Sequence, residues 1–479
     1  MSIMKRPWFL ALPSLLLFIL FIAVNGAYLH RVPGLLGDEG SEGENVFQLL
    51  QKDTITIVGE RSYIGPIIDY VRVPYIAVFG YTPLALRMLM LTASIATFIL
   101  AGSVLRKWFG EEVGMIALTF FSFSPVFVLQ QRIGWAITLN VVFAWLLMYA
   151  LMSNWKQKWL LSGLIAGLGL SNDIIFFPIF IAIIVCFSVV YLWSSHIRTR
   201  IIEALSWFWI FCVGLIAGFG TQFAVLLLLT EDQGSRAEVV AGFSSRLQDF
   251  LPSLPLYVSG SSYVARYTGF EFSPSAIVAI TSILGIFAVL GLFHKKRLYV
   301  LAIVTGVVMQ SYVLLYMVDR FTLRYFAVIS MSAWLLAGVG AGVIIKKFIP
   351  ARIGAYVPLV LAFILSVWIG YSAFIPFLQT GGSLKEFSLG NRNDKSSAFV
   401  DIRPLVSCVR GIGVVYSPTQ DIFDRLQYLS HEYEDLLVVD GERKSSAAWT
   451  VVYRKVDDPI IRDPSSPCPD VPFFRVVKR

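Results

Sequence analysis

Two acidic residues stand side by side at Asp38-Glu39, within the sequence Leu36-Gly37-Asp38-Glu39-Gly40, and two more follow at Glu42 and Glu44. Carboxylates placed so closely can accept a proton during a reaction or help to hold a divalent cation. The ordinary alternative is a solvated loop whose acids favour the N-terminus of the helix that follows. Two neighbouring acids alone do not decide between these interpretations.

Other kinds of reactive site have less support in the sequence. Of the four histidines, only His30 lies near the acids, and no metal-ligand spacing is present. A divalent cation held by Asp38, Glu39 and Glu42 is therefore the less favoured use of these acids, and the sequence predicts no cofactor and no metal site. No Ser-His-Asp or Cys-His arrangement can be recognised.

The segments that must position these acids are strongly apolar. Of the 479 residues, 57% are hydrophobic and 15% are charged, whereas soluble domains have roughly 25% charged residues. The mean hydropathy is +0.72, and the apolar residues come in blocks long enough to cross a hydrocarbon core of roughly 30 Å. The net charge of +8 lies in short Lys and Arg clusters between these blocks, which is typical of cytoplasmic loops. We therefore expect a multi-pass membrane protein that does not bind nucleic acid.

The apolar pattern predicts eleven transmembrane helices, over residues 8–28, 83–104, 112–130, 134–152, 158–171, 174–194, 205–230, 275–293, 298–318, 324–345 and 353–377. With the N-terminus in the cytoplasm, every inner connection carries basic residues, in agreement with the positive-inside rule. The first block could instead be a cleavable signal peptide, although it is longer than the usual core of ~7–15 residues. Residues 158–171 and 174–194 are separated by a very short turn. If they formed one broken segment, the orientation of everything downstream would invert.

Three regions are expected outside the membrane. Residues 29–82 hold the acids and two amphipathic stretches, Val46–Leu50 and Ile67–Tyr75, which we expect to form helices lying at the membrane surface. Residues 231–274 are polar and aromatic. After a transmembrane domain of residues 1–379, the tail 380–479 has strand-like runs at Gly413–Tyr416, Leu436–Val439 and Trp449–Tyr453 and a helical pattern over Asp421–Tyr433. This tail predicts a small α/β domain docked on the outer face.

Cysteines and glycines give two further expectations. Cys186 and Cys212 fall within the apolar blocks, where cysteine packs as a small hydrophobic residue. Cys408 and Cys468 fall in the outer tail, where an oxidising compartment would allow a disulfide, although the sequence gives no distance between them. Glycines recur within the blocks and indicate close helix packing; they are Gly163/Gly167, Gly214/Gly218 and Gly338/Gly340/Gly342.

The order of these features resembles the GT-C superfamily of glycosyltransferases, specifically its protein O-mannosyltransferase and aminoarabinose-transferase branch. That branch has an Asp-Glu motif in a long first outer loop, interfacial helices, a similar number of spans and often an outer C-terminal domain. The similar stretches cover most of residues 1–345; they are Asp38-Glu39, Tyr63–Ile67, Phe79-Gly80, Leu84–Arg87, Trp159–Leu170, and Asp319-Arg320 through Arg324–Phe326. The sequence departs from the family at Ile64-Gly65, where a His is frequent, at 131–138, where a second acid is frequent, and at Asn172-Asp173, where a basic residue is common.

The resemblance implies an α-helical polytopic GT-C-like fold and an inverting transfer of a sugar from a polyprenyl-phosphate donor to a hydroxyl on a lipid, glycan or protein. Such a transfer needs a carboxylate to take the acceptor proton and guanidinium groups to bind the departing phosphate. Asp38 is the expected base, with Glu39 as its support or alternate. The phosphate candidates are Arg320, Arg324, Arg132 and Arg266, and the residues expected to line the substrate cavity are Tyr63, Tyr325 and Asp173. Each arginine could instead be a surface anchor, and Asp173 could instead cap the following helix.

Other functions stay open at this stage. A transporter or flippase of a lipid-linked or small substrate needs ionisable residues within its spans, and these spans are nearly free of charge. A polysaccharide ligase would share the location and substrate class, and a scaffolding role would follow if the departures had removed activity. The expected location is the cytoplasmic (inner) membrane, with the N-terminus in the cytoplasm and the active site and C-terminal domain outside.

Overall fold

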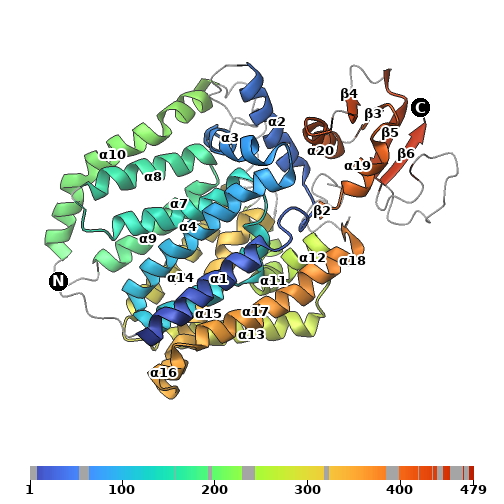
Figure 1. The fold of residues 1–479 in the computed structure, drawn as a ribbon. Helices are drawn as coiled ribbons and strands as arrows, with labels where there is room; N and C mark the ends of the chain where they lie inside the picture. Colours follow the sequence, from blue (N-terminus) through green and yellow to red (C-terminus); the bar gives the residue numbers. More distant parts are fainter. Residues whose placement is uncertain are drawn as a thin grey trace.

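A computed structural model describes residues 8–52, 64–155, 157–192, 197–228, 243–317, 323–383, 399–418, 420–433, 435–439, 446–453, 468 and 474–478. Most of these residues are helical and form one bundle (Figure 1). The helices up to residue 228 are α1 (Trp8–Gly26), α2 (Gly37–Lys52), α3 (Ile67–Phe79), α4 (Pro83–Phe109), α5 (Glu111–Ser122), α6 (Pro125–Gln130), α7 (Ala136–Leu151), α8 (Lys158–Asn172), α9 (Phe176–Leu192) and α10 (Ile197–Leu228).

The second half of the bundle begins with α11 (Phe243–Ser259) and α12 (Ser261–Thr268). It continues with α13 (Pro274–Gly291), α14 (Arg297–Met317), α15 (Leu323–Phe348), α16 (Ala351–Gly354), α17 (Val357–Ile369), the π-helical turn η3 (Gly370–Phe374) and α18 (Ile375–Thr380). By length and composition, five of the described helical segments can cross a membrane; they start at Pro83, Pro274, Arg297, Arg324 and Ala351.

The described residues of each of the eleven ranges expected to span the membrane are mostly helical, and five of the described segments are long and apolar enough for a multi-pass membrane protein. Two ranges hold more than one helix: 353–377 runs from the end of α16 through α17 and η3 into α18, and 112–130 holds α5 and α6. The Ser124 hydroxyl accepts a hydrogen bond from the Phe127 N–H, and Pro125 follows at the first helical position. This N-cap ends one helix and begins another. The count of eleven crossings stays a prediction.

Glycine faces explain how the helices approach one another. A Cβ at Gly163 or Gly167 of α8 would collide with the backbone of α10 at Phe211 or Leu215. A Cβ at Gly340 of α15 would collide in the same way with the Phe287 carbonyl of α13. The helices therefore touch along their backbones, which is the arrangement that small residues permit in membranes. The expectation of close packing at these glycines is confirmed.

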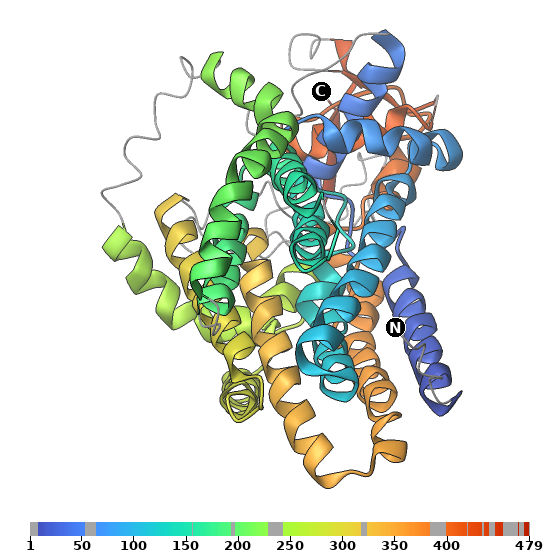
Figure 2. The same ribbon diagram turned by 90° about the vertical axis from the view of Figure 1, so that its left-hand side faces the viewer.

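The helices α2 and α3 lie at one end of the bundle, and α3 runs across that end before α4 descends (Figure 2). Both amphipathic stretches are thus helical, as expected. Val46 of α2 and Ile68 of α3 are fully buried. Their apolar faces pack against protein, and their placement at a membrane surface stays a prediction.

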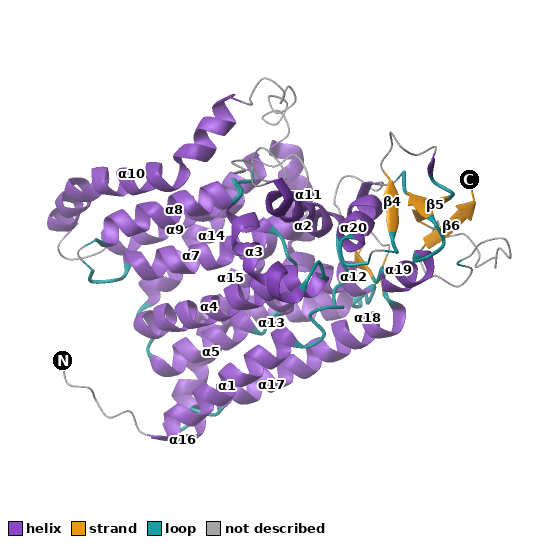
Figure 3. Cartoon of the chain, turned by 45° about the horizontal axis from the view of Figure 1, so that its top comes forward, coloured by secondary structure: helices purple, strands orange, loops and turns teal. Residues whose placement is uncertain are grey.

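The C-terminal segment adds the strands, and Figure 3 shows the described ones at the α2–α3 end of the bundle. Strands β3 (Val414–Tyr416), β4 (Leu437–Val439), β5 (Trp449–Tyr453) and β6 (Phe474–Lys478) form a sheet in the order β4-β3-β5-β6. Strand β3 is parallel to β4 and β5, and β6 is antiparallel to β5. The short pair β1 (Gly382–Ser383) and β2 (Phe399–Val400) and the helices α19 (Arg403–Val409) and α20 (Gln420–Ser430) complete the described elements.

The C-terminal segment packs directly on the helices that follow α1. One hydrophobic cluster joins Val46, Ile76 and Leu86 of α2–α4 with Leu426 and Leu429 of α20. Cys408 and Cys468 form a disulfide with 5.8 Å between their Cα atoms, so that bond, which the sequence left open, is present. The strands and helix that the sequence predicts here are also present. The boundary at residue 380 and the outer location stay predictions.

Candidate active site

The site begins where α2 starts. Asp38 lies in the first turn of α2, and its Oδ2 is 2.6 Å from Nη1 of Arg324, in the first turn of α15. The Asp38 side chain is 24% exposed and that of Arg324 is 20% exposed. The two charges make a charge-assisted hydrogen bond. The pair is partly exposed and therefore reachable by a ligand.

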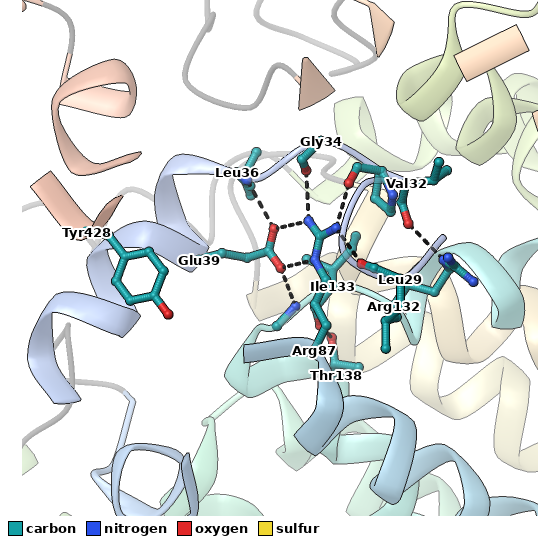
Figure 4. Close-up of polar contacts among 12 residues, drawn as sticks. Leu29, Val32, Gly34, Leu36, Glu39, Arg87, Arg132, Ile133, Thr138 and Tyr428 are labelled. Carbon is teal, nitrogen blue, oxygen red and sulfur yellow. Dashed lines mark hydrogen bonds and ion pairs between the residues drawn. The ribbon is translucent and has the colours of Figure 1, made fainter. Parts of the chain in front are cut away.

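Glu39 is the next residue, but it faces the interior and is fully buried. Its carboxylate accepts two hydrogen bonds from Arg87, at 3.0 and 2.7 Å, and two from the backbone N–H groups of Gly134 and Leu36, at 2.7 and 3.0 Å. Figure 4 shows the carboxylate turned toward Arg87. The Leu36 contact is one half of a capping box, in which a side chain at the third helical position reaches back to the cap.

A second buried pair repeats the pattern one turn along α2. Nη2 of Arg72, on α3, is 2.6 Å from Oε2 of Glu42. The other Glu42 oxygen accepts a hydrogen bond from the Ala136 N–H at 3.3 Å, and Arg72 also donates to the Gly134 carbonyl. Glu39 and Glu42, three residues apart on one helix face, therefore hold the segment Gly134–Ala136 from both sides.

Aromatic rings surround the Arg324 guanidinium. Its central carbon lies 5.1 Å from the ring centroid of Trp135 and 5.3 Å from that of Tyr325. Its Nη2 is 3.5 Å from the Tyr325 hydroxyl. Cations within about 6 Å of a ring centroid are attracted by the ring face. The expected cavity residue Tyr325 is thus beside the expected phosphate ligand Arg324.

Arg266 belongs to the same neighbourhood. It lies on the short helix α12, is 6% exposed, and interacts electrostatically with Asp38, Arg324 and the two tyrosines of its helix. Burial lowers the pKa of Arg266; the phenol of Tyr267 raises it, and the Arg324 charge lowers it further. The Tyr267 hydroxyl is anchored by a 2.8 Å hydrogen bond to Gln130. The structure therefore brings together Asp38, Arg324, Tyr325 and Arg266.

Arg132 is placed elsewhere, against the C-terminus of α1. Its guanidinium donates to the carbonyls of Val24, Asn25, Ala27 and Val32, at 2.8 Å for Val32 and 2.9 Å for Asn25. A cation at a helix C-terminus satisfies orphan carbonyls and complements the helix dipole. Only 1% of the side chain is exposed. This guanidinium is occupied by backbone carbonyls at the end of α1 and in the segment that follows it.

Asp173 lies at the turn between α8 and α9. Its carboxylate accepts a hydrogen bond from the Ile175 N–H at 2.8 Å, and its backbone pairs with Ile64. The first contact is that of an Asx turn just before α9, which satisfies the Ile175 N–H rather than an N–H of the helix, so the cap that the sequence left as an alternative stays a prediction. Tyr63 and Arg320 lie outside the described residues.

The buried carboxylates near Asp38 are paired with arginines. This pairing is relevant to whether they could bind a metal cation. Glu39 is paired with Arg87, and Glu42 with Arg72. Within the described ranges, no group of three His, Cys, Asp or Glu side chains is arranged to hold a metal ion. The chemistry that the described cluster supports is proton acceptance beside a guanidinium.

Two features of the cluster escape sequence reasoning. Trp135 was read only as part of a segment lacking a second acid, although an aromatic residue after Gly134 is the signal that could have marked it. The partnership of Arg72 with Glu42 had no signal beyond the charges themselves.

Comparison with known proteins gives a result for the fold and none for the sequence. No family model matches the sequence, and no curated protein matches it. The structure is similar to ArnT from Cupriavidus metallidurans in the apo state, with a TM-score of 0.51 and 11% identity over 92% of this chain and 91% of that chain. It is also similar to the apo Archaeoglobus fulgidus oligosaccharyltransferase, with a TM-score of 0.51 and 14% identity over 95% of this chain and 70% of that chain.

The same ArnT bound to undecaprenyl phosphate superposes less well, with a TM-score of 0.44, so the two apo structures carry the comparison. At these identities the likeness shows only the fold. The chemistry has to be inferred from the residues of the site. The chain has the same overall helical fold as these two apo structures.

Proposed function

We propose that the protein transfers a sugar from a polyprenyl-phosphate donor to a hydroxyl on the outer side of the cytoplasmic membrane, with Asp38 as general base. The observation that supports this most directly is the partly exposed Asp38–Arg324 pair, with 2.6 Å between its charged atoms. A carboxylate beside a guanidinium would let one group accept a proton while the other binds phosphate. The buried Arg266 adds a second positive charge nearby.

The reaction that fits these groups is an inverting displacement. The acceptor oxygen forms a bond to the anomeric carbon while the bond from that carbon to the phosphate oxygen breaks. The electron pair of the broken bond leaves with the phosphate, and the acceptor proton passes to Asp38. Arg324 then shares its hydrogen bonds between Asp38 and the phosphate, which frees a carboxylate oxygen for the proton and stabilises the negative charge that develops on the leaving group.

The donor chain has a matching space. Counting from Arg324, residues at i+4, i+7, i+8 and i+11 of α15 lie on one helix face. They are Val328, Met331, Ser332 and Leu335, and all four line a partly open cavity among α4, α5, α7, α9, α14 and α15. Most of its other lining residues are apolar. A lipid whose phosphate meets Arg324 could place its hydrocarbon in this space.

The remaining expected site residues take supporting roles in this proposal. Glu39 has four hydrogen-bond donors around its carboxylate and no exposure, so we assign it to holding α2 and the Gly134 segment rather than to accepting a proton. Arg132 is assigned to the C-terminus of α1 and Asp173 to the start of α9. Arg324 and Arg266 are the proposed phosphate ligands, and Tyr325 is the proposed cavity residue.

The test is transfer by the purified protein from candidate polyprenyl-phosphate sugars, with wild type compared with Asp38→Asn. A matched control is Glu111→Gln, which changes another carboxylate in a first helical turn, paired with Arg106 at 3.5 Å beyond the far end of α4. We expect Asp38→Asn to abolish transfer and Glu111→Gln to retain it. Transfer that survives Asp38→Asn would show that another group is the base. Lipid movement across vesicles without any transfer would favour the flippase alternative.

A further inference from the structure

Trp135 has no role in the proposed chemistry. It is nevertheless buried beside the Arg324 guanidinium, and the residues on either side of it form hydrogen bonds with α2. We propose that Trp135 is a positioning residue, whose indole holds the Arg324 guanidinium against Asp38. The inference rests on the proposed function for its catalytic consequence. The contact itself does not depend on that function.

The indole is well placed for this task. Only 2% of Trp135 is exposed, and the Arg324 guanidinium carbon lies 5.1 Å from its ring centroid. The attraction between a cation and a ring is strongest for tryptophan and grows when water is excluded. An arginine side chain is long and has many rotamers, so a fixed ring face beside the guanidinium restricts where its charge can lie.

The indole is itself fixed by the segment on either side of it. The Gly134 N–H donates to Glu39 at 2.7 Å, and the Ala136 N–H donates to Glu42 at 3.3 Å. The Gly134 carbonyl accepts from Arg72. The two residues that flank Trp135 are therefore tied to two buried carboxylate–arginine pairs, which resist displacement because each charge would lose its partner.

Gly134 shows how closely this segment is held. A Cβ at that position would lie 3.1 Å from the Leu86 Cβ and 3.2 Å from Oε1 of Glu39. Side-chain contacts are rarely that short, so the segment sits directly against α2 and α4. A chain of contacts thus runs from Glu39 and Glu42, through the backbone around Trp135, to Arg324 and back to Asp38 on α2. Both ends of this series of contacts are on α2. The same helix therefore sets the positions of the indole and of Asp38.

Trp135→Leu and Trp135→Phe separate the ring face from simple bulk. Because a cation–ring contact of this kind is worth about tenfold or more when buried, we expect Trp135→Leu to lower kcat/KM for transfer by about that factor. Trp135→Phe keeps a ring face and should recover most of it. The control is Trp334→Leu on α15, which removes an equally buried indole that donates to the Val258 carbonyl. Its kcat/KM should stay close to that of wild type once the folded fraction is matched.

The decisive comparison is the Arg324→Met background. If Trp135 acts through Arg324, Trp135→Leu adds no further loss of kcat/KM there, whereas a purely structural role gives losses that multiply. Thermal unfolding is also measured without substrate for wild type, Trp135→Leu, Arg324→Met and the double variant. Non-additive effects of the two substitutions on the unfolding midpoint support the contact. If wild type transfers no sugar but the midpoints are non-additive, the proposed function fails and the positioning role stands. Additive midpoints, or multiplying losses of kcat/KM, overturn the inference.

Discussion

The two neighbouring acids should respond in opposite ways to the same chemical change. Glu39→Gln keeps the size of the side chain but replaces one acceptor oxygen by an NH₂ donor. The wild-type carboxylate accepts four hydrogen bonds, from Arg87 twice and from the backbone of Leu36 and Gly134. One amide oxygen can accept two of these at most, so two buried donors lose their acceptor and face an NH₂ group instead.

The expected cost follows from these lost contacts. Each buried polar group left unpaired costs about 1–3 kcal/mol, and breaking one side of a buried ion pair costs about 3–5 kcal/mol in total. Asp38→Asn removes a pair that is 24% and 20% exposed, and such partly solvated pairs are worth about 1 kcal/mol or less. Glu39→Gln should therefore lower the free energy of unfolding by at least ~2 kcal/mol more than Asp38→Asn.

The assay is thermal unfolding of the detergent-solubilised proteins, followed by tryptophan fluorescence and by protection from protease. Activity is measured on the same samples at a temperature where all are folded. We expect Asp38→Asn to melt near wild type without activity, and Glu39→Gln to melt well below it with part of its activity retained. The reasoning fails if Glu39→Gln melts with wild type, or if Asp38→Asn is the less stable of the two.

Three further predictions concern the scaffold. Gly340→Ala should destabilise the protein by several kcal/mol because its Cβ meets a backbone carbonyl of α13. The control Gly285→Ala has open space around it and should melt at or slightly above wild type. Equal melting temperatures of the two variants would contradict the packing. Cys408→Ser removes the bond to Cys468 and should destabilise the C-terminal segment by about 2–5 kcal/mol, seen as faster proteolysis there, and a reductant should act only on wild type. Tyr428→Phe loses a 3.1 Å hydrogen bond to the Thr82 carbonyl and should cost about 1 kcal/mol in thermal melts, and an unchanged midpoint would count against that contact.

The sequence predicted local structure well where the signals are local. The strand Trp449–Tyr453 has the bounds that its β-branched and aromatic run indicates, and the helix predicted over 421–433 appears as Gln420–Ser430. The sequence predicts one span over 112–130 because that range is apolar throughout. Its break depends on one hydroxyl of Ser124 that accepts the Phe127 N–H, and apolarity cannot show that.

The site was less predictable because its contacts are remote in sequence. Arg87 meets Glu39 across 48 positions, and Gly134 meets Glu39 across 95. Helical spacing can place Glu39 and Glu42 on one face, but it cannot say which arginine faces them. Arg132 looked like an outer cation free to bind phosphate. Its four carbonyl partners come from the first span and the loop after it, and only the tertiary fold brings them near.

The helix geometry of α2 explains why two consecutive acids can have different chemistry. Successive residues of a helix point about 100° apart, and residues three apart point only about 60° apart and so share a face. Glu39 and Glu42 therefore share the face that meets Arg87 and Arg72, while Asp38 turns to Arg324. The two buried carboxylates hold α2 in place through their ion pairs with these arginines. Asp38 lies on a helix that its neighbours hold in place, and its side chain stays partly exposed. A general base requires both a fixed position and access to its substrate.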